Sequence, residues 1–388
     1  MAFEELSFSQ TGFCRLTLGA MERPRVGTSG LPLVGERLLI DGVDAVRVTF
    51  RCEVPQRAQC YLLLNTVTDR SREHIEDFRM DRCDGACELE CALPADAILS
   101  YQFALCGPAG IDPRVRVDMG SWVRLVEEGR PDAFNPLRLV NGRGHAASIF
   151  VGPDAQLSWP SSDVGAPAMH AHRDEDIGAE VRARIGGDLS RCVVVHDGEQ
   201  TPTRTLIVFD GEVWRANGVG WLTRRYPGLR VVTIGAGGVE ARRRELTDGD
   251  AVSALLGAVC DVAGLGPVAV AGQSFGGLAV LQAALVGSIP IECFIAQSPS
   301  LWWGGEVRGR GEGALMGDLG RGVCRSLSGL TIWCQVGMRE VAMVPVVDRC
   351  AALLGECGAL VRLEHYSGGH DVAWWREGLL AALDEWCA

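Results

Sequence analysis

The sequence contains no lysine, because all 37 of its lysine-plus-arginine residues are arginine. This absence excludes Schiff-base and Ser-Lys catalysis, which need a lysine amine. No basic run is longer than Arg242-Arg243-Arg244, and the formal net charge is −12, so we expect no nucleic-acid binding. No apolar run approaches the roughly 18 residues that span a membrane, so we expect no membrane segment.

The first twenty residues also lack a positively charged start followed by an apolar stretch, so we expect no signal peptide. Cysteine is present in an odd number, fifteen, and its positions are scattered. Without an export signal, this pattern predicts free thiols in a reducing cytoplasm. Cys83, Cys87 and Cys91 recur every four residues, but metal ligands usually come in pairs around a turn. Because Cys87, Leu89 and Cys91 alternate as on one strand face, we interpret them as packing residues.

A length of 388 residues favours two domains, and 47% hydrophobic with 22% charged residues is typical of a globular protein. Residues 1–155 show short alternating apolar segments separated by turn residues, which predicts an N-terminal, Ig-like β-sandwich. These strand candidates are Val46–Glu53, Cys60–Leu64, Ala86–Leu93 and Ser100–Cys106. Residues 156–188 are polar and read as a linker, in which His170 and His172 lie on a solvated loop rather than bind a metal.

Residues 189–388 alternate strand-like and helix-like segments, which predicts a mostly parallel sheet with helices on both faces. The strand candidates are Cys192–His196, Thr205–Phe209, Arg230–Ile234, Pro267–Ala271, Cys293–Gln297, Thr331–Val336 and Leu360–Tyr366; the helix candidates include Ala251–Ala263, Gly277–Val286, Val347–Glu356 and Trp374–Trp386. Ligands of such sheets bind beyond the carboxyl ends of the strands. The expected fold class is α/β, with an α/β-hydrolase domain behind the β-sandwich.

A strand, a sharp glycine-flanked turn and a helix surround Ser274. Four small apolar residues precede Gly272-Gln273-Ser274-Phe275-Gly276-Gly277, and a Leu-, Ala- and Val-rich segment follows it. This is the context of a nucleophile elbow, in which glycines let the chain pass closely while the serine hydroxyl stands above the sheet. We therefore predict that Ser274 is a catalytic nucleophile.

Two further residues follow later strands in the order that such hydrolases use. His370 lies on the Gly-rich loop after the last strand, where its imidazole can act as general base and then as general acid. Glu340 follows the penultimate strand and is the best candidate for the carboxylate that orients the imidazole. Asp348 and Asp371 are weaker candidates, and a Ser-His dyad without an acid stays open.

Stabilisation of a developing oxyanion requires two amide donors. The N–H of Phe275, directly after the nucleophile, is one candidate. The second is the N–H of Glu212, in the loop after an early strand. The Gly-rich stretch at 235–238 lacks the third glycine of a dinucleotide-binding fingerprint, so we interpret it as a loop on the substrate side.

With these stretches in view, the chain resembles the enterochelin (ferric enterobactin) esterase family through most of its length. The resemblance is carried by segments in both halves: Asn135-Pro136, Gly142–Ala146, Phe209–Trp214, Arg242–Leu246, Val270–Gly277, Gln297–Trp303, Gly337–Glu340, Gly368–Asp371 and Trp375-Arg376. It implies hydrolysis, in the cytoplasm, of the trilactone esters of catecholate siderophores. Iron then enters only as part of the substrate, and no resident cofactor or metal is expected.

The resemblance also implies that Arg242 and Arg339 meet anionic catecholates, with Trp302 and Trp303 nearby. A tris-catecholate iron complex is a trianion with flat aromatic faces, which guanidinium and indole groups can bind. Packing in a core is the other interpretation of the two tryptophans. The siderophore, the number of ester bonds cut and the oligomeric state stay open.

Two other functions are compatible with these residues. One is an esterase, acyltransferase or thioesterase of the same fold that acts on another ester. The other is a binding protein in which the β-sandwich acts beside an inactive hydrolase domain. The serine, histidine and acid in the expected order favour an enzyme over this last alternative.

Overall fold

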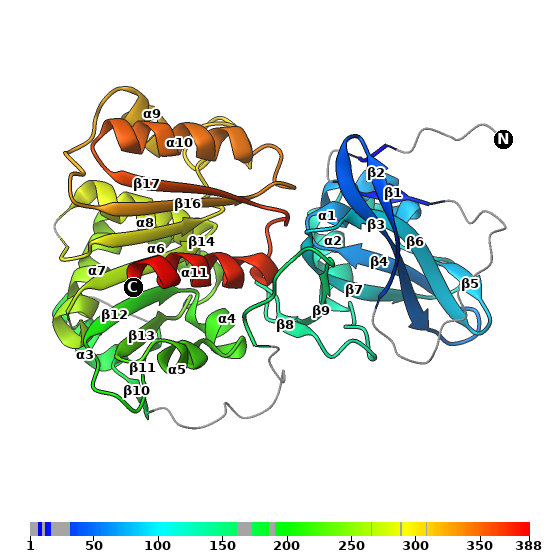
Figure 1. Cartoon of the computed structure of the whole chain (residues 1–388), viewed down its shortest axis with the longest axis horizontal. Helices are drawn as coiled ribbons and strands as arrows, with labels where there is room; N and C mark the ends of the chain where they lie inside the picture. Colours follow the sequence, from blue (N-terminus) through cyan, green and yellow to red (C-terminus); the bar gives the residue numbers. More distant parts are fainter. Residues whose placement is uncertain are drawn as a thin grey trace. The chain divides into compact units, whose positions relative to one another are not determined.

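Within the residues that the structure describes, the strands form three sheets, two of them antiparallel and one mostly parallel (Figure 1). The computed structural model describes residues 7–9, 12–16, 32–160, 173–185, 191–264, 266–287, 289–307 and 309–388. The chain divides into two compact units. The first comprises residues 1–164 with 338–341 and 367–374, and the second holds the remaining residues.

The first unit contains both antiparallel sheets. One has the order β1-β6-β3-β2, with β5 paired to β6, and the other has the order β4-β7-β9-β8. The strands are β1 (Cys14–Arg15), β2 (Leu33–Ile40), β3 (Val43–Glu53), β4 (Gln59–Leu64), β5 (Asp81–Cys83), β6 (Ala86–Pro94), β7 (Ile98–Cys106), β8 (Arg138–Val140) and β9 (Ala146–Val151). Its helices are α1 (Val67–Arg70), η1 (Arg72–Phe78), η2 (Pro113–Arg116) and α2 (Met119–Glu127).

The two antiparallel sheets share one apolar core. Phe50 of β3 packs edge-on against Tyr101 of β7, with ring centroids 4.9 Å apart, and its ring lies 6.3 Å from that of Phe150 of β9. Cys87 and Leu89 are buried on the same face of β6, as the alternation in the sequence predicted.

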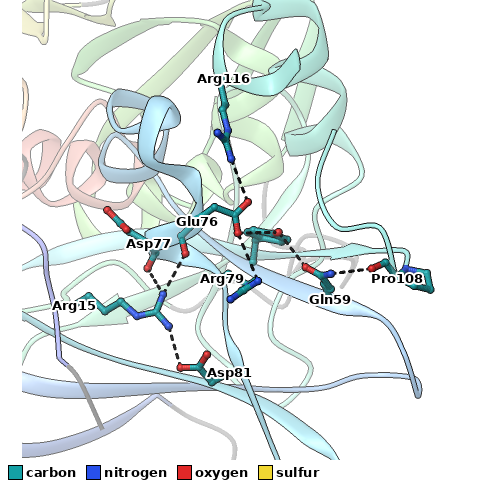
Figure 2. A network of polar contacts seen from close by, with 9 residues as sticks. Arg15, Gln59, Glu76, Asp77, Arg79, Asp81, Pro108 and Arg116 are labelled. Atoms are coloured by element: carbon teal, nitrogen blue, oxygen red, sulfur yellow. Dashed lines mark hydrogen bonds and ion pairs between the residues drawn. The ribbon is translucent and has the colours of Figure 1, made fainter. Parts of the chain in front are cut away.

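A polar network ties β1 to the region around η1 (Figure 2). The Arg15 guanidinium donates to the carbonyls of Glu76 and Asp77, at 3.3 and 2.8 Å, and to the Asp81 carboxylate at 3.0 Å. The Glu76 carboxylate in turn lies 3.4 Å from Arg116 of η2. These side chains are partly exposed, so each ion pair contributes little stability, and the network mainly fixes the course of β1.

The second unit is built on an eight-stranded sheet of order β10-β11-β13-β12-β14-β15-β16-β17. Only the β10–β11 and β11–β13 pairs are antiparallel. The strands are β10 (Arg173–Asp176), β11 (Val193–Asp197), β12 (Arg204–Phe209), β13 (Leu229–Ile234), β14 (Val268–Gln273), β15 (Cys293–Gln297), β16 (Thr331–Gly337) and β17 (Leu360–Tyr366). The strands predicted for this half are confirmed, with ends that differ from the prediction by at most two residues.

Helices cover both faces of this sheet, and α11 crosses one of them in Figure 1. Ile207 and Phe209 of β12 belong to the core formed with α7 and α8, whereas Leu206 and Val208 are buried on the opposite face. The helices are α3 (Gly178–Ile185), α4 (Gly211–Ala216), η3 (Val219–Trp221), α5 (Leu222–Arg225), α6 (Val239–Leu246), α7 (Gly249–Ala263), α8 (Phe275–Val286), α9 (Ala314–Gly320), α10 (Val344–Glu356) and α11 (Val372–Trp386). No helix in the described ranges is long and apolar enough to cross a membrane.

Two expectations from the sequence need correction. Part of the predicted linker is regular structure, since β10 and α3 lie within residues 173–185 and β10 pairs with β11. The expectation of free thiols is wrong for Cys324 and Cys357, which form a disulfide, while the other thirteen cysteines remain thiols. His170 and His172 lie outside the described residues.

Candidate functional site

Ser274 occupies a strained turn between β14 and α8. Its φ is 58° and its ψ −116°, a backbone conformation that residues other than glycine rarely adopt. The glycines of the turn are required by close contacts. A Cβ on Gly272 would lie 2.3 Å from the carbonyl oxygen of Gly276, and one on Gly277 would lie 2.9 Å from that of Gln297. The structure therefore has the geometry predicted for a nucleophile elbow.

The Ser274 hydroxyl has a serine neighbour that the sequence did not reveal. Its Oγ lies 3.2 Å from Oγ of Ser300, and the Ser300 N–H donates to the Ser274 carbonyl at 2.9 Å. Ser300 is buried in the loop after β15, whereas Ser274 is half-buried. Ser300 lies in the segment Gln297–Trp303 that carries the family resemblance, but nothing local in the sequence links it to Ser274, because its position depends on the pairing of β14 with β15.

A row of three buried glutamines, ended by a glutamate, crosses the sheet at the position of the residue before the nucleophile. Gln273, Gln297, Gln335 and Glu364 are aligned partners on β14, β15, β16 and β17. Gln273 Nε2 donates to Gln297 Oε1 at 2.8 Å, and Gln297 Nε2 donates to Gln335 Oε1 at 2.7 Å. Gln335 Nε2 then donates to the Glu364 carboxylate at 2.9 Å. This amide row fixes the register of the four strands beneath the elbow.

The amide row also binds the two helices α4 and α11. At one side, the indole N–H of Trp214 in α4 donates to Gln273 Oε1 at 2.9 Å. In the middle, Gln297 Nε2 donates to the carbonyl of Trp375 in α11, also at 2.9 Å. A Cβ on Gly378 would lie 2.7 Å from Gln335 Oε1, so this glycine lets α11 approach the row.

Two tryptophan rings and one guanidinium group lie around the ring of Phe275, the first residue of α8. The rings of Phe275, Trp302 and Trp303 have centroids 5.3 to 5.8 Å apart, and both tryptophans are half-exposed. The Arg242 guanidinium lies 5.6 Å above the Phe275 ring. A cation beside exposed aromatic faces is suited to flat, anionic ligands.

Arg242 is held in place by a carboxylate. Its Nε and one terminal nitrogen donate to the two oxygens of Asp210, at 2.5 and 2.7 Å. Burial lowers the pKa of Arg242, but the charge and hydrogen bonds of Asp210, together with the charge of Glu212, outweigh burial, so the pKa is raised. Asp210 has a left-handed backbone, with φ 57°, at the start of α4. This residue was not identified from the sequence, although it lies in the loop assigned to the oxyanion hole.

The two predicted oxyanion-hole amides lie in the first turns of two helices. Phe275 is the first residue of α8 and Glu212 the second of α4, positions at which N–H groups have no acceptor within their helix. The Glu212 carboxylate accepts the N–H of Ala236, at 3.0 and 2.8 Å. The stretch at 235–238 is thereby anchored to α4.

His370 and Glu340 form a hydrogen-bonded pair in the first unit. Nδ1 of His370 lies 2.6 Å from Oε1 of Glu340, and Glu340 is fully buried. Glu340 follows β16 by three residues, and His370 follows β17 by four. The other two acidic candidates have different partners. Asp348 lies 2.7 Å from Nε2 of His365, and Asp371 accepts the N–H of Ser100 at 2.6 Å.

Arg339 is buried next to Glu340 in the sequence. Only 5% of the residue is exposed, and one terminal nitrogen donates to the carbonyl of Gly12 at 3.4 Å. Burial lowers the pKa of Arg339 to about 10. Its guanidinium is thus enclosed by protein, unlike that of Arg242, so a direct contact between Arg339 and a catecholate would need the segment around Gly12 to move.

No three His, Cys, Asp or Glu side chains converge as metal ligands within the part of the chain that the structure describes. In particular, Cys83, Cys87 and Cys91 do not form such a group together with any other described residue.

Comparison with known proteins gives consistent results. A family profile described as "Enterochelin esterase, N-terminal" matches residues 47–159. An iron(III) enterobactin esterase of Escherichia coli O6:H1 is 31% identical over 284 residues, which cover 68% of this chain and 69% of the relative. An iron(III) salmochelin esterase of the same strain is 26% identical over 377 residues, covering 89% of this chain and 88% of that one. The crystal structure of the enterobactin esterase from Shigella flexneri in the presence of enterobactin superposes with a TM-score of 0.73 at 26% identity, over 92% of this chain and 96% of that chain.

Proposed function

Because the chain belongs to the iron(III) enterobactin (enterochelin) esterase family, we propose that it hydrolyses the ester bonds of a ferric catecholate trilactone siderophore such as enterobactin, which releases the iron. Iron is part of the substrate, and the proposed chemistry uses no resident cofactor. The observation that carries the proposal is the elbow conformation of Ser274, with the half-exposed Phe275, Trp302 and Trp303 beside it.

We assign Ser274 as nucleophile, His370 as general base and Glu340 as the acid that orients it. In this assignment Ser274 Oγ attacks the ester carbonyl while His370 Nε2 takes its proton, and His370 then protonates the departing alcohol. Water attacks the acyl-enzyme with the help of the same imidazole. The assignment is supported by the order of the sheet, because β14, β16 and β17 are parallel and the three residues follow their carboxyl ends.

The N–H groups of Phe275 and Glu212 are our candidates for the oxyanion hole, because both lie at helix starts. Arg242, Trp302 and Trp303 are our candidates for catecholate binding, since they offer a positive charge and aromatic faces next to the nucleophile. Burial makes Arg339 a weaker candidate for direct binding.

We further propose that the second unit is an α/β-hydrolase domain and that the two antiparallel sheets form a β-sandwich that precedes it. We also propose that the reaction takes place in the cytoplasm. The thirteen thiols support a reducing compartment, and the Cys324–Cys357 disulfide is the feature that opposes it.

The test is hydrolysis of ferric enterobactin by the full chain, followed as release of dihydroxybenzoyl-serine products. We expect Ser274→Ala to lower kcat by at least about a thousandfold. Turnover of simple aryl esters without turnover of any trilactone would favour another ester as the substrate. Unchanged trilactone turnover by Ser274→Ala would refute the proposed site.

A further inference from the structure

Thr66 has a backbone conformation that is unusual for its residue type. It lies between β4 and α1 with a φ of 65° and a ψ of −35°, and only 2% of it is exposed. A β-branched residue with positive φ is an outlier, because its Cβ is crowded by the backbone. Strain of this kind persists where the surrounding structure enforces it, often at functional sites. The contacts of Thr66 show which part of the molecule it serves.

The Thr66 hydroxyl binds the main chain of His370. Its Oγ1 accepts the His370 N–H at 2.6 Å and donates to Oδ1 of Asn65 at 2.9 Å. The segments that carry Thr66 and Gly369 approach so closely that a Cβ on Gly369 would lie 2.2 Å from Thr66 Oγ1. Gly369 therefore lets the histidine loop rest directly on the threonine hydroxyl.

Strand β7 holds the same loop on both sides of His370. The Ser367 carbonyl accepts the N–H of Ile98 at 3.2 Å, and Asp371 Oδ2 accepts the N–H of Ser100 at 2.6 Å. Asp371 Oδ1 also accepts the Ala373 N–H at 3.0 Å, which caps the start of α11. The antiparallel sheets thus fix the main chain before and after the histidine, and Thr66 fixes the histidine itself.

Asp69, three residues after Thr66, interacts electrostatically with the His370 side chain. One of its carboxyl oxygens, Oδ1, is buried, although the residue as a whole is half-exposed. Burial raises the pKa of the Asp69 carboxyl, while the charges of Arg70 and His370 act against this rise. The His370 ring therefore lies within electrostatic range of α1, in agreement with the hydrogen bond from its main chain.

We propose that Thr66 is a positioning residue for the catalytic base, so that the N-terminal sheets are part of the catalytic machinery. This inference rests on the proposed role of His370 as the base. Glu340 orients the ring through Nδ1, and Thr66 fixes the main chain that carries the ring. Both restraints are needed, because a misplacement of about 1 Å at a catalytic group can cost about a hundredfold in rate.

Two substitutions in the full chain separate the hydroxyl from the shape of the side chain. Thr66→Val keeps the β-branched shape and removes the acceptor, whereas Thr66→Ser keeps the acceptor. With ferric enterobactin, we expect Thr66→Val to lower kcat by about 10- to 100-fold with KM changed less than about threefold. Thr66→Ser should restore kcat to within about threefold of the wild type. A purely structural role would not give rescue by the serine variant.

A third variant covers the case in which Thr66→Val does not fold. Thr66→Gly removes the hydroxyl but adopts a positive φ without strain. We expect it to fold, with a thermal midpoint at or near that of the wild type, and to lose as much kcat as the valine variant. The rate at which a fluorophosphonate reagent labels Ser274 should fall in parallel in both variants, because the base activates this serine.

Wild-type kcat and labelling rate in folded Thr66→Val or Thr66→Gly would overturn the inference. Equal losses in Thr66→Ser and Thr66→Val would also overturn it, since the hydroxyl would then not be the determinant. Ser274→Ala distinguishes these results from failure of the proposed function. If that variant is inactive while the Thr66 variants are fully active, the inference alone is wrong; if Ser274→Ala stays active, the proposed site is wrong.

Discussion

Oε1 of Glu340 lies 2.6 Å from Nδ1 of His370, and no part of Glu340 reaches the surface. A carboxylate in this position favours the tautomer with the proton on Nδ1, which leaves Nε2 as the acceptor that the proposed role of base requires. The sequence left open whether the site uses this acid or works as a Ser-His dyad, so the pair is the first relationship to test.

We expect Glu340→Gln to lower kcat by about 10²- to 10⁴-fold, because the amide can turn its NH₂ group toward Nδ1 and favour the wrong tautomer. The measurement is kcat for ferric enterobactin at saturating concentration. Asp348→Asn is the matched control, since it alters a histidine–carboxylate pair on α10 with His365 and should leave kcat within about twofold. A Glu340→Gln enzyme with wild-type kcat would show that the site is a dyad.

Arg242→Gln should weaken binding of an anionic substrate more than that of a neutral one. The substitution removes a cation next to Phe275 and leaves the Asp210 carboxylate without its partner. We expect KM for ferric enterobactin to rise at least about tenfold, with a smaller change for an uncharged aryl ester. Arg243→Gln is the control, because Arg243 is exposed and pairs with Glu240. Equal changes with both esters would contradict a role of Arg242 in charge recognition.

Gln297→Leu should destabilise the second unit. It leaves Gln273 Nε2 and Gln335 Oε1 without their partners in the amide row, and each orphaned buried polar group costs about 1–3 kcal/mol. We expect the free energy of unfolding in urea to fall by about 3 kcal/mol. Gln282→Leu, which removes one 3.3 Å bond to the Thr247 carbonyl, should cost less than about 1 kcal/mol. Similar losses in both variants would show that the amide row adds no specific stability.

Asp69→Asn should change the pH dependence of stability. Burial raises the pKa of the folded-state Asp69 carboxyl, so the folded protein binds this proton more tightly than the unfolded chain does. The contribution of Asp69 to stability is therefore fully present below its unfolded pKa and is lost as the pH rises through its folded pKa.

We accordingly expect Asp69→Asn to be more stable than the wild type at pH 7, with the difference shrinking as the pH falls toward about 4. Urea unfolding across this range measures the difference. Asp77→Asn, on an exposed residue of η1, controls for loss of a surface charge. A difference that grows on acidification would contradict the assigned sign.

The sequence was sufficient to predict the elements whose signal is local. The strand of small apolar residues, the glycine turn and the apolar helix around Ser274 all lie within one short stretch, and the structure has all three. The strand β10 was missed because its sequence, Arg-Asp-Glu-Asp, is wholly polar and its pairing with β11 uses main-chain groups. The disulfide was missed because cysteine pairing over 33 residues depends on the fold.

Residues that depend on register or on distant contacts were beyond the reach of the sequence. The amide row requires β14, β15, β16 and β17 to be aligned residue by residue, and no single glutamine reveals this. Thr66 and His370 are 304 positions apart, so their hydrogen bond has no local signal. A positive φ at a threonine is the feature that would direct attention to it, and it is visible only in coordinates.

The amide row has only one self-consistent arrangement of its hydrogens. The indole of Trp214 at one end can only donate, and the Glu364 carboxylate at the other end accepts both Gln335 and the Tyr366 hydroxyl. Turning over any one glutamine would set two NH₂ groups or two carbonyls face to face, so the polarity of the chain is dictated from its ends. The side-chain amide dipoles of the three glutamines therefore all point the same way across the sheet, starting at the residue that precedes the serine.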